Sequence, residues 1–268
     1  MPMNEFVDKK VKIGLFDSGI GGFSILTQLL NLIPQADYFY YSDDANAPYG
    51  PKSDEFITQR SIEITEVLLR AGVELIVVAC NTATAASIDT LRTKYPQIPF
   101  VGVEPYLNAY YKMPEGKKSM AVLTTESTGK SERFKRLKEK LDPAGNIIHY
   151  SLPNMARLIE DFYFKKISQE QFIKEIHAEL LPIKNNHHSH LILGCTHYPL
   201  IGNIIEKETG AISVSPDRYV ALRVAEVLKL KINQSNEFKF DFHFCSSSNN
   251  NQWVIKNHAD CSLPLKNC

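Results

Sequence analysis

The stretch Leu75-Ile76-Val77-Val78-Ala79-Cys80-Asn81-Thr82 leads an apolar run directly into a thiol and two polar side chains. A second stretch, Leu191-Ile192-Leu193-Gly194-Cys195-Thr196-His197, has the same order. Short apolar runs of this kind are typical of buried strands in parallel sheets. Because binding crevices form at the carboxyl ends of such strands, both thiols are placed for chemistry. Two matched sites suggest an enzyme that uses two thiols on one substrate.

The rest of the chain alternates between similar apolar runs and amphipathic segments. Further strands are predicted at residues 11–16, 36–41, 100–103, 119–124, 147–150 and 238–245. Helices are predicted at residues 23–32, 53–71, 83–95, 155–164, 169–181 and 219–230. This regular alternation predicts an α/β fold with mainly parallel sheets flanked by helices.

The strand-helix pattern restarts near residue 119, and each half contains one of the two cysteine strands. We therefore expect two pseudo-symmetric α/β domains with the active site in the cleft between them. The first would comprise residues 11–103 plus 214–268, and the second residues 104–213. The final segment is assigned to the first domain because it is too small to bury a core of its own.

The composition narrows the class of protein. Lys plus Arg and Asp plus Glu both number 30, so the net charge is zero, which gives no electrostatic reason to expect nucleic acid or a membrane surface as partner. No apolar run approaches the roughly 18 residues of a membrane span, and the first residues lack a signal core. An odd count of five cysteines without a CxxC pair fits free thiols in a reducing cytoplasm rather than structural zinc.

The two cysteines have a plain alternative interpretation, since cysteine is often a small buried hydrophobe. The side chains of Asn81 and Thr82, and of Thr196 and His197, argue against it, because buried polar groups need partners. His197 is also suited to exchange a proton with a nearby thiol.

Two polar loops allow a structural and a functional interpretation. Asp17-Ser18 follows the first strand and could cap the next helix, or it could polarise a thiol while Ser18 and glycine amides hold an anion. The matched cysteines favour the functional interpretation. Asn46-Ala47-Pro48-Tyr49-Gly50 could be a simple turn or could present Tyr49 and the Gly50 amide to a ligand.

Other motifs are set aside. Residues 126–131 end in Gly-Lys-Ser like a P-loop, but Thr124 stands where the first glycine is required, so nucleotide binding is rejected. The histidines at 187, 188 and 190 are assigned to a solvated loop rather than a metal site. Cys245, Cys261 and Cys268 are given no role, and Trp253 is assigned to packing.

Four blocks resemble the signatures of the glutamate racemase family, within the cofactor-independent aspartate/glutamate racemases. They are Phe16-Asp17-Ser18-Gly19-Ile20-Gly21-Gly22, Pro48-Tyr49-Gly50, Ala79-Cys80-Asn81-Thr82-Ala83 and Leu193-Gly194-Cys195-Thr196-His197-Tyr198-Pro199-Leu200. The resemblance implies interconversion of L- and D-glutamate for peptidoglycan synthesis, with no cofactor and no metal. Glutamate is the implied partner, and a homodimer is left open.

The resemblance also implies roles for particular residues. Cys80 and Cys195 would be the acid/base catalysts, Asp17 would assist Cys80, and His197 would assist Cys195. Glu160 would be a second assisting acid. The implied substrate-binding residues are Asp17, Ser18, Tyr49, Gly50, Asn81, Thr82, Thr125, Thr128, Thr196 and His197. Two thiols suit an inversion at Cα, because one can remove a proton from one face while the other delivers one to the opposite face.

Departures from the family pattern occur at residues 42–44, 104–108, 215–217 and 245–247. The first two are expected to alter the pocket or its lid, and the last two to affect packing. Two alternatives stay open: a two-thiol racemase acting on aspartate, and a binding or regulatory protein whose catalysis is lost or secondary.

Overall fold

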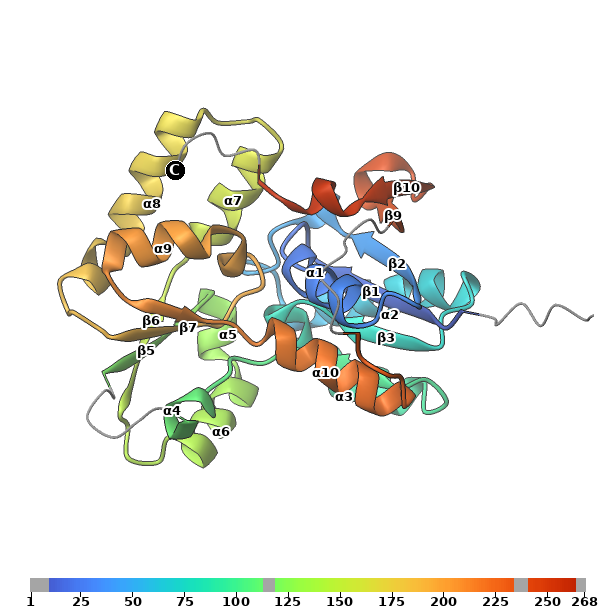
Figure 1. Ribbon diagram of the computed structural model, residues 1–268, viewed down its shortest axis with the longest axis horizontal. Coiled ribbons are helices and arrows are strands. Elements are labelled where there is room, and N and C mark those ends of the chain that lie inside the picture. The colour runs from blue at the N-terminus through green and yellow to red at the C-terminus, as the bar shows by residue number, and fades with distance from the viewer. Residues whose placement is uncertain (1–9, 113–118, 234–240, 264–268) are drawn as a thin grey trace, which may run out of the picture.

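The computed structural model describes residues 10–112, 119–233 and 241–263. These residues form two separate sheets, shown side by side in Figure 1. The larger sheet has the strand order β10 (Trp253–Asn257), β9 (Asp241–Ser246), β2 (Asp37–Ser42), β1 (Lys12–Asp17), β3 (Leu75–Val78) and β4 (Phe100–Gly102). The smaller has the order β6 (Ile147–Ser151), β5 (Met120–Thr124), β7 (His190–Leu193) and β8 (Ile212–Val214).

Helices connect and cover the strands. In chain order they are α1 (Phe23–Leu32), α2 (Asp54–Arg70), α3 (Asn81–Lys94), α4 (Ala109–Lys112), α5 (Glu126–Lys130), α6 (Glu132–Leu141), α7 (Met155–Tyr163), α8 (Gln169–Lys184), α9 (Gly202–Thr209) and α10 (Asp217–Leu228). Figure 1 shows α7, α8 and α9 on one side of the smaller sheet and α4 and α6 on the other. The predicted α/β class is confirmed.

The two cysteine strands lie inside their sheets. β3 pairs in parallel with β1 and β4, and β7 pairs in parallel with β5 and β8. All four residues of each strand are buried. A parallel strand covered by helices on both faces buries every side chain, which explains the unbroken apolar runs.

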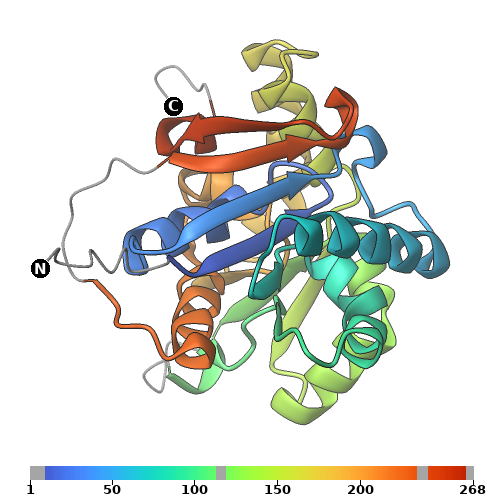
Figure 2. The same ribbon diagram turned by 90° about the vertical axis from the view of Figure 1, so that its right-hand side faces the viewer.

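The end of the chain adds two strands to the larger sheet. β9 pairs in parallel with β2, and β10 pairs antiparallel with β9, as Figure 2 shows for the red and blue strands. β9 confirms the predicted strand from residue 241 onward, while residues 238–240 lie outside the described part. β8 and β10 were not predicted. Both are edge strands with exposed apolar residues, Ile212 and Ile255, so neither has a buried apolar run.

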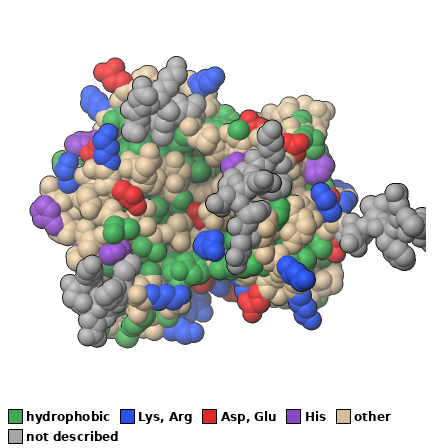
Figure 3. Space-filling model, in the orientation of Figure 1, with side chains coloured by type: hydrophobic (Ala, Val, Ile, Leu, Met, Phe, Trp, Pro, Cys, Tyr) green, Lys and Arg blue, Asp and Glu red, His purple; other side chains and the backbone are tan. Residues whose placement is uncertain are grey.

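One apolar cluster joins the two sheets. It contains buried side chains of β1 and α1, such as Leu15 and Leu26, together with Leu158 of α7 and Leu193 of β7. A shared core of this kind fixes the two cysteine strands relative to each other. In the described part of the chain, no helix is long and apolar enough to cross a membrane. Charged side chains of both signs are scattered over the face shown in Figure 3.

Candidate active site

Both candidate thiols stand two residues beyond their strands. Cys80 follows β3 and caps α3, where its Sγ accepts a hydrogen bond from the Ala83 amide at 3.5 Å. Cys195 follows β7. Each residue is only 5% exposed, so the two thiols are shielded from bulk water. Burial and the negative charge of Asp17 raise the pKa of the Cys80 thiol well above its usual value.

Asp17, at the end of β1, is fully buried beside Cys80. Its Oδ1 accepts the Ser18 amide at 2.7 Å, and its Oδ2 accepts the Gly22 amide at 2.6 Å and the Thr196 hydroxyl at 3.3 Å. Burial raises the pKa of Asp17, and the charge of His197 and a hydrogen bond with Cys80 oppose the rise. The carboxylate therefore links the loop after β1 with the loop after β7.

His197 has partners on both ring nitrogens. Nδ1 lies 3.8 Å from the Cys195 sulfur, and Nε2 lies 2.6 Å from Glu160 Oε1. Burial alone lowers the pKa of His197, but hydrogen bonds with Cys195 and Glu160 and the Glu160 charge outweigh it and raise the pKa well above its usual value. His197 thus has the two contacts needed to pass a proton toward Cys195, with Glu160 orienting the ring.

Glu160 lies on α7, but its contacts reach across to the loop after β1. Its Oε1 also accepts the Ile20 amide at 2.8 Å. A Cβ atom at Gly19 would lie 1.8 Å from this oxygen, and one at Gly21 would lie 2.4 Å from His197 Nδ1. Glycine is therefore required at both positions, because any side chain would displace the groups next to Cys195.

Three threonine hydroxyls meet between α3 and α5. The Oγ1 atom of Thr82 lies 3.1 Å from that of Thr125 and 3.2 Å from that of Thr128, and the last two lie 3.0 Å apart. All three residues are buried. The three hydroxyls therefore satisfy one another, and they belong to segments that follow β3 and β5, one from each sheet.

These contacts bring predicted residues from the segments after β1, β3, β5 and β7, and from helix α7, into buried positions around the two thiols. Similarity to known proteins agrees with the geometry: a family model described as Asp/Glu/Hydantoin racemase matches residues 24–218. A glutamate racemase of Clostridium botulinum is 40% identical over 202 residues, which cover 75% of this chain and 77% of that relative. The chain belongs to the glutamate racemase family. It is accordingly an amino-acid racemase, an isomerase.

Solved structures of glutamate racemases share the two-sheet fold. The Escherichia coli enzyme in complex with L-glutamate and the activator UDP-MurNAc-Ala aligns with a TM-score of 0.76 at 26% identity, covering 88% of this chain and 89% of that one. The Francisella tularensis enzyme in complex with D-glutamate aligns with a TM-score of 0.68 at 28% identity, covering 89% and 88%.

In the loop after β2, the Tyr49 side chain has a different partner from the one expected for this racemase. Tyr49 was expected to face a ligand, but its hydroxyl donates to Asp43 Oδ2 at 2.6 Å. Gly50 remains open, since a Cβ there would meet only Thr125 Cβ, at 4.0 Å. Asn81 donates through Nδ2 to the Val103 carbonyl at 3.5 Å, and its buried Oδ1 has no hydrogen-bond partner among the described residues.

Sequence reasoning missed two residues close to this site. Asp43, flagged only as part of a variant loop, is completely buried, and Arg60 of α2 binds it through two nitrogens. The available signal was an acidic residue directly after a buried strand, one position beyond the place that Asp17 has at the end of β1. The departure at residues 245–247 has a structural explanation: Ser246 donates to the Asp44 carboxylate at 2.8 Å.

The histidine motif in the smaller sheet was assigned wrongly to a solvated loop. His188 and His190 are buried, and the His188 ring lies 2.9 Å from the Tyr150 hydroxyl. His190 is the first residue of β7, because the strand begins one residue before the short apolar pattern suggests, while His187 is exposed as expected. The described residues contain no cluster of metal-ligating side chains.

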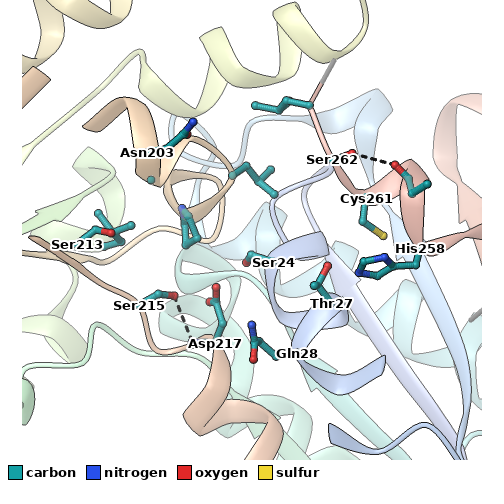
Figure 4. Close-up of a pocket in the computed structure, with 16 residues that line it drawn as sticks. Ser24, Thr27, Gln28, Asn203, Ser213, Ser215, Asp217, His258, Cys261 and Ser262 are labelled. Carbon is teal, nitrogen blue, oxygen red and sulfur yellow. Dashed lines mark hydrogen bonds between the residues drawn. The ribbon is translucent and has the colours of Figure 1, made fainter. Parts of the chain in front are cut away.

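A cavity of about 640 Å³ lies beside the active-site loops of the racemase (Figure 4). Neither Cys80 nor Cys195 lines it. Its walls come from α1, residues 199–203, residues 213–217 and residues 258–263. Ser24 connects it to the site, because its hydroxyl is 3.2 Å from the Thr196 carbonyl oxygen. Asp217 points into this cavity, with Oδ1 unpartnered among the described residues.

Proposed function

We propose that this racemase interconverts L- and D-glutamate through Cys80 and Cys195, which exchange protons with opposite faces of Cα. The observation that supports this most strongly is that each thiol has its own buried assisting group. Asp17 lies beside Cys80, and His197 lies 3.8 Å from Cys195. Solved relatives bound to L-glutamate and to D-glutamate support the choice of substrate.

The proposed mechanism follows from the different surroundings of the thiols. The raised pKa of Cys80 means that this thiol holds its proton, which makes it a proton donor. The raised pKa of His197 lets it hold a proton beside Cys195, so a positive charge assists this sulfur. In one direction Cys195 removes the Cα proton while Cys80 delivers its own to the other face. In the reverse direction the roles exchange.

The Cα proton is far less acidic than a thiol, so the developing carbanion needs electrostatic stabilisation in a site shielded from water. The hydroxyls of Ser18, Thr82 and Thr196 and the Gly50 amide are proposed to bind the substrate carboxylates. Asn81 Oδ1, which has no hydrogen-bond partner within the part of the chain that the structure describes, is proposed to accept a hydrogen bond from the substrate ammonium group. Thr125 and Thr128 would exchange their mutual hydrogen bonds for bonds to substrate.

We also propose that residues 11–103 with 214–268 and residues 104–213 are two domains with the substrate site between them. The supporting observation is that the threonine hydroxyls meet between segments that follow strands of different sheets. Four described cysteines are unpaired, which fits a cytoplasmic location and a supply of D-glutamate for peptidoglycan. A homodimer stays a prediction that light scattering after size-exclusion chromatography would test.

The decisive experiment is incubation with L-glutamate in D2O while Cα deuteration and optical rotation are followed. Loss of rotation with deuterium uptake is expected. Exchange with aspartate but not glutamate would favour the aspartate alternative, and no exchange with either would favour a binding protein. Cys80→Ser and Cys195→Ser should each abolish net racemisation. Full activity in either variant would contradict the two-thiol mechanism.

A further inference from the structure

The loop that follows β2 is organised around one buried carboxylate. Asp43 is completely buried, and its oxygens accept four hydrogen bonds. Arg60 donates through Nε at 3.0 Å and through a terminal nitrogen at 2.7 Å, Tyr49 donates its hydroxyl at 2.6 Å, and Asn46 donates its amide at 3.0 Å. These contacts link α2 to the whole loop between residues 43 and 49.

Stability alone is a poor explanation for this arrangement. Removing a carboxylate and a guanidinium from water costs about as much as their attraction returns, so buried ion pairs add little net stability. What such a pair provides is a fixed direction, because the planar guanidinium binds both carboxylate oxygens in one geometry. The Arg60 side chain is 21% exposed and that of Asp43 is 0% exposed, so the fixed partner is the carboxylate.

The groups that Asp43 fixes are close to the proposed catalytic residues. Tyr49 is 1% exposed and packs in the same apolar cluster as Cys80. Burial and the Asp43 charge raise the pKa of Tyr49, so its hydroxyl stays protonated and donates to the carboxylate. The next residue, Gly50, faces Thr125 across an open gap.

Asp43 is also tied to the loop that carries Asp17. Its backbone amide donates to the Asp17 carbonyl oxygen at 3.0 Å, beyond the last paired residues of β1 and β2. One residue therefore connects three parts of the site: the end of β1, the Tyr49–Gly50 segment and helix α2. A shift of Asp43 would move the Gly50 amide relative to Cys80.

We propose that Asp43 and Arg60 are positioning residues that hold the Tyr49–Gly50 segment against Cys80 and Thr125, so that its backbone can bind the substrate. The Tyr49 hydroxyl acts as an anchor toward Asp43 and not as a ligand for substrate. This inference rests on the proposed function, since the segment is assigned to substrate binding there.

The test compares Arg60→Lys, Asp43→Asn and Tyr49→Phe with the unaltered protein. Tyr49→Phe removes one charge-assisted hydrogen bond, and KM for glutamate should rise roughly tenfold while kcat stays within about twofold. Arg60→Lys loses the two-nitrogen fork and should have a similar effect. Asp43→Asn removes the charge that binds the Arg60 fork, which then keeps only its ion pair with Glu63, and should raise KM roughly 100-fold, as displacement of a binding group does. Arg223→Gln, which breaks an exposed ion pair with Glu226 on α10, is the matched control.

Amide hydrogen exchange gives a second readout that does not depend on catalysis. Exchange in peptides covering residues 44–52 should become faster in the three variants and stay unchanged in the control. Because Arg60→Lys and Tyr49→Phe act through the same carboxylate, their combined effect on KM should be smaller than the product of the single effects.

The outcomes separate the two proposals. An unaltered protein that does not racemise glutamate would refute the proposed function, and hydrogen exchange would still decide whether Asp43 orders the loop. Unchanged exchange in residues 44–52 would overturn the positioning role. So would an unchanged KM in an active protein whose loop exchange had become faster. If Asp43→Asn does not fold, the two milder variants decide the question.

Discussion

Replacing Asp217 by asparagine should make the protein more stable at neutral pH but not at acidic pH. Asp217 is 7% exposed, and its Oδ1 has no partner among the described residues. Burial raises the pKa of this carboxyl from 3.8 to about 6, although Ser215 and Ser24 oppose the rise. Between these pH values the folded chain holds a proton that the unfolded chain has already released.

The sign and size of the effect follow from this difference. Because the folded state binds more protons, the free energy of unfolding falls as pH rises, from about pH 4 until pH passes 6. Each pH unit in this interval is worth about 1.4 kcal/mol, so ionised Asp217 costs the folded protein roughly 3 kcal/mol at pH 7.5. Asparagine keeps the shape and removes the charge, so the variant avoids this loss.

Urea unfolding at several pH values between 4.5 and 7.5 measures the effect. The stability of Asp217→Asn relative to the unaltered protein should increase by about 2 kcal/mol across this range. Glu139→Gln, which neutralises an exposed carboxylate, is the control and should show no such trend. A stability difference for Asp217→Asn that is the same at pH 4.5 and pH 7.5 would refute the reasoning.

Three further perturbations test the site and the core. Gly21→Ala places a Cβ 2.4 Å from His197 Nδ1 and should reduce racemisation at least 100-fold with retained circular dichroism, while Gly202→Ala, which meets only ordinary contacts, should keep full activity. Glu160→Gln removes the carboxylate from His197 Nε2 and should lower kcat/KM roughly 100-fold. The loss should be equal in both directions, because the two enantiomers have equal free energy. Unchanged kinetics would contradict the role of Glu160. Leu26→Ala removes a fully buried side chain from the cluster that joins the sheets, and urea unfolding should show a loss of stability of about 3 kcal/mol. A loss below about 1 kcal/mol would show that this cluster is loosely packed.

Much of the candidate site could be predicted because its residues occupy strand ends. Cys80 and Cys195 each follow a completely buried strand, and Asp17 ends another. An apolar run and the polar residues after it are adjacent in the chain, so the pattern is visible without a structure. The predicted strands and most helix boundaries follow from the same local signals, such as Ser53, which caps α2.

Contacts between distant residues could not be predicted in this way. Asp43 pairs with Arg60 on helix α2, which has many exposed residues. No sequence pattern near either residue indicates this ion pair. The hydroxyl of Tyr49 donates a hydrogen bond to Asp43, which the sequence did not indicate. The edge strands β8 and β10 also lacked a signal, because edge strands need no buried apolar run.

The sequence by itself determined the class of fold, the two thiols and the family, because each depends on residues that are neighbours in the chain. Tertiary structure decided how the groups around those thiols contact one another. Glu160 reaches His197 and the Ile20 amide only because α7 packs beside the loop after β1. The properties of buried groups depend on what surrounds them in space, and the chain order does not contain that information.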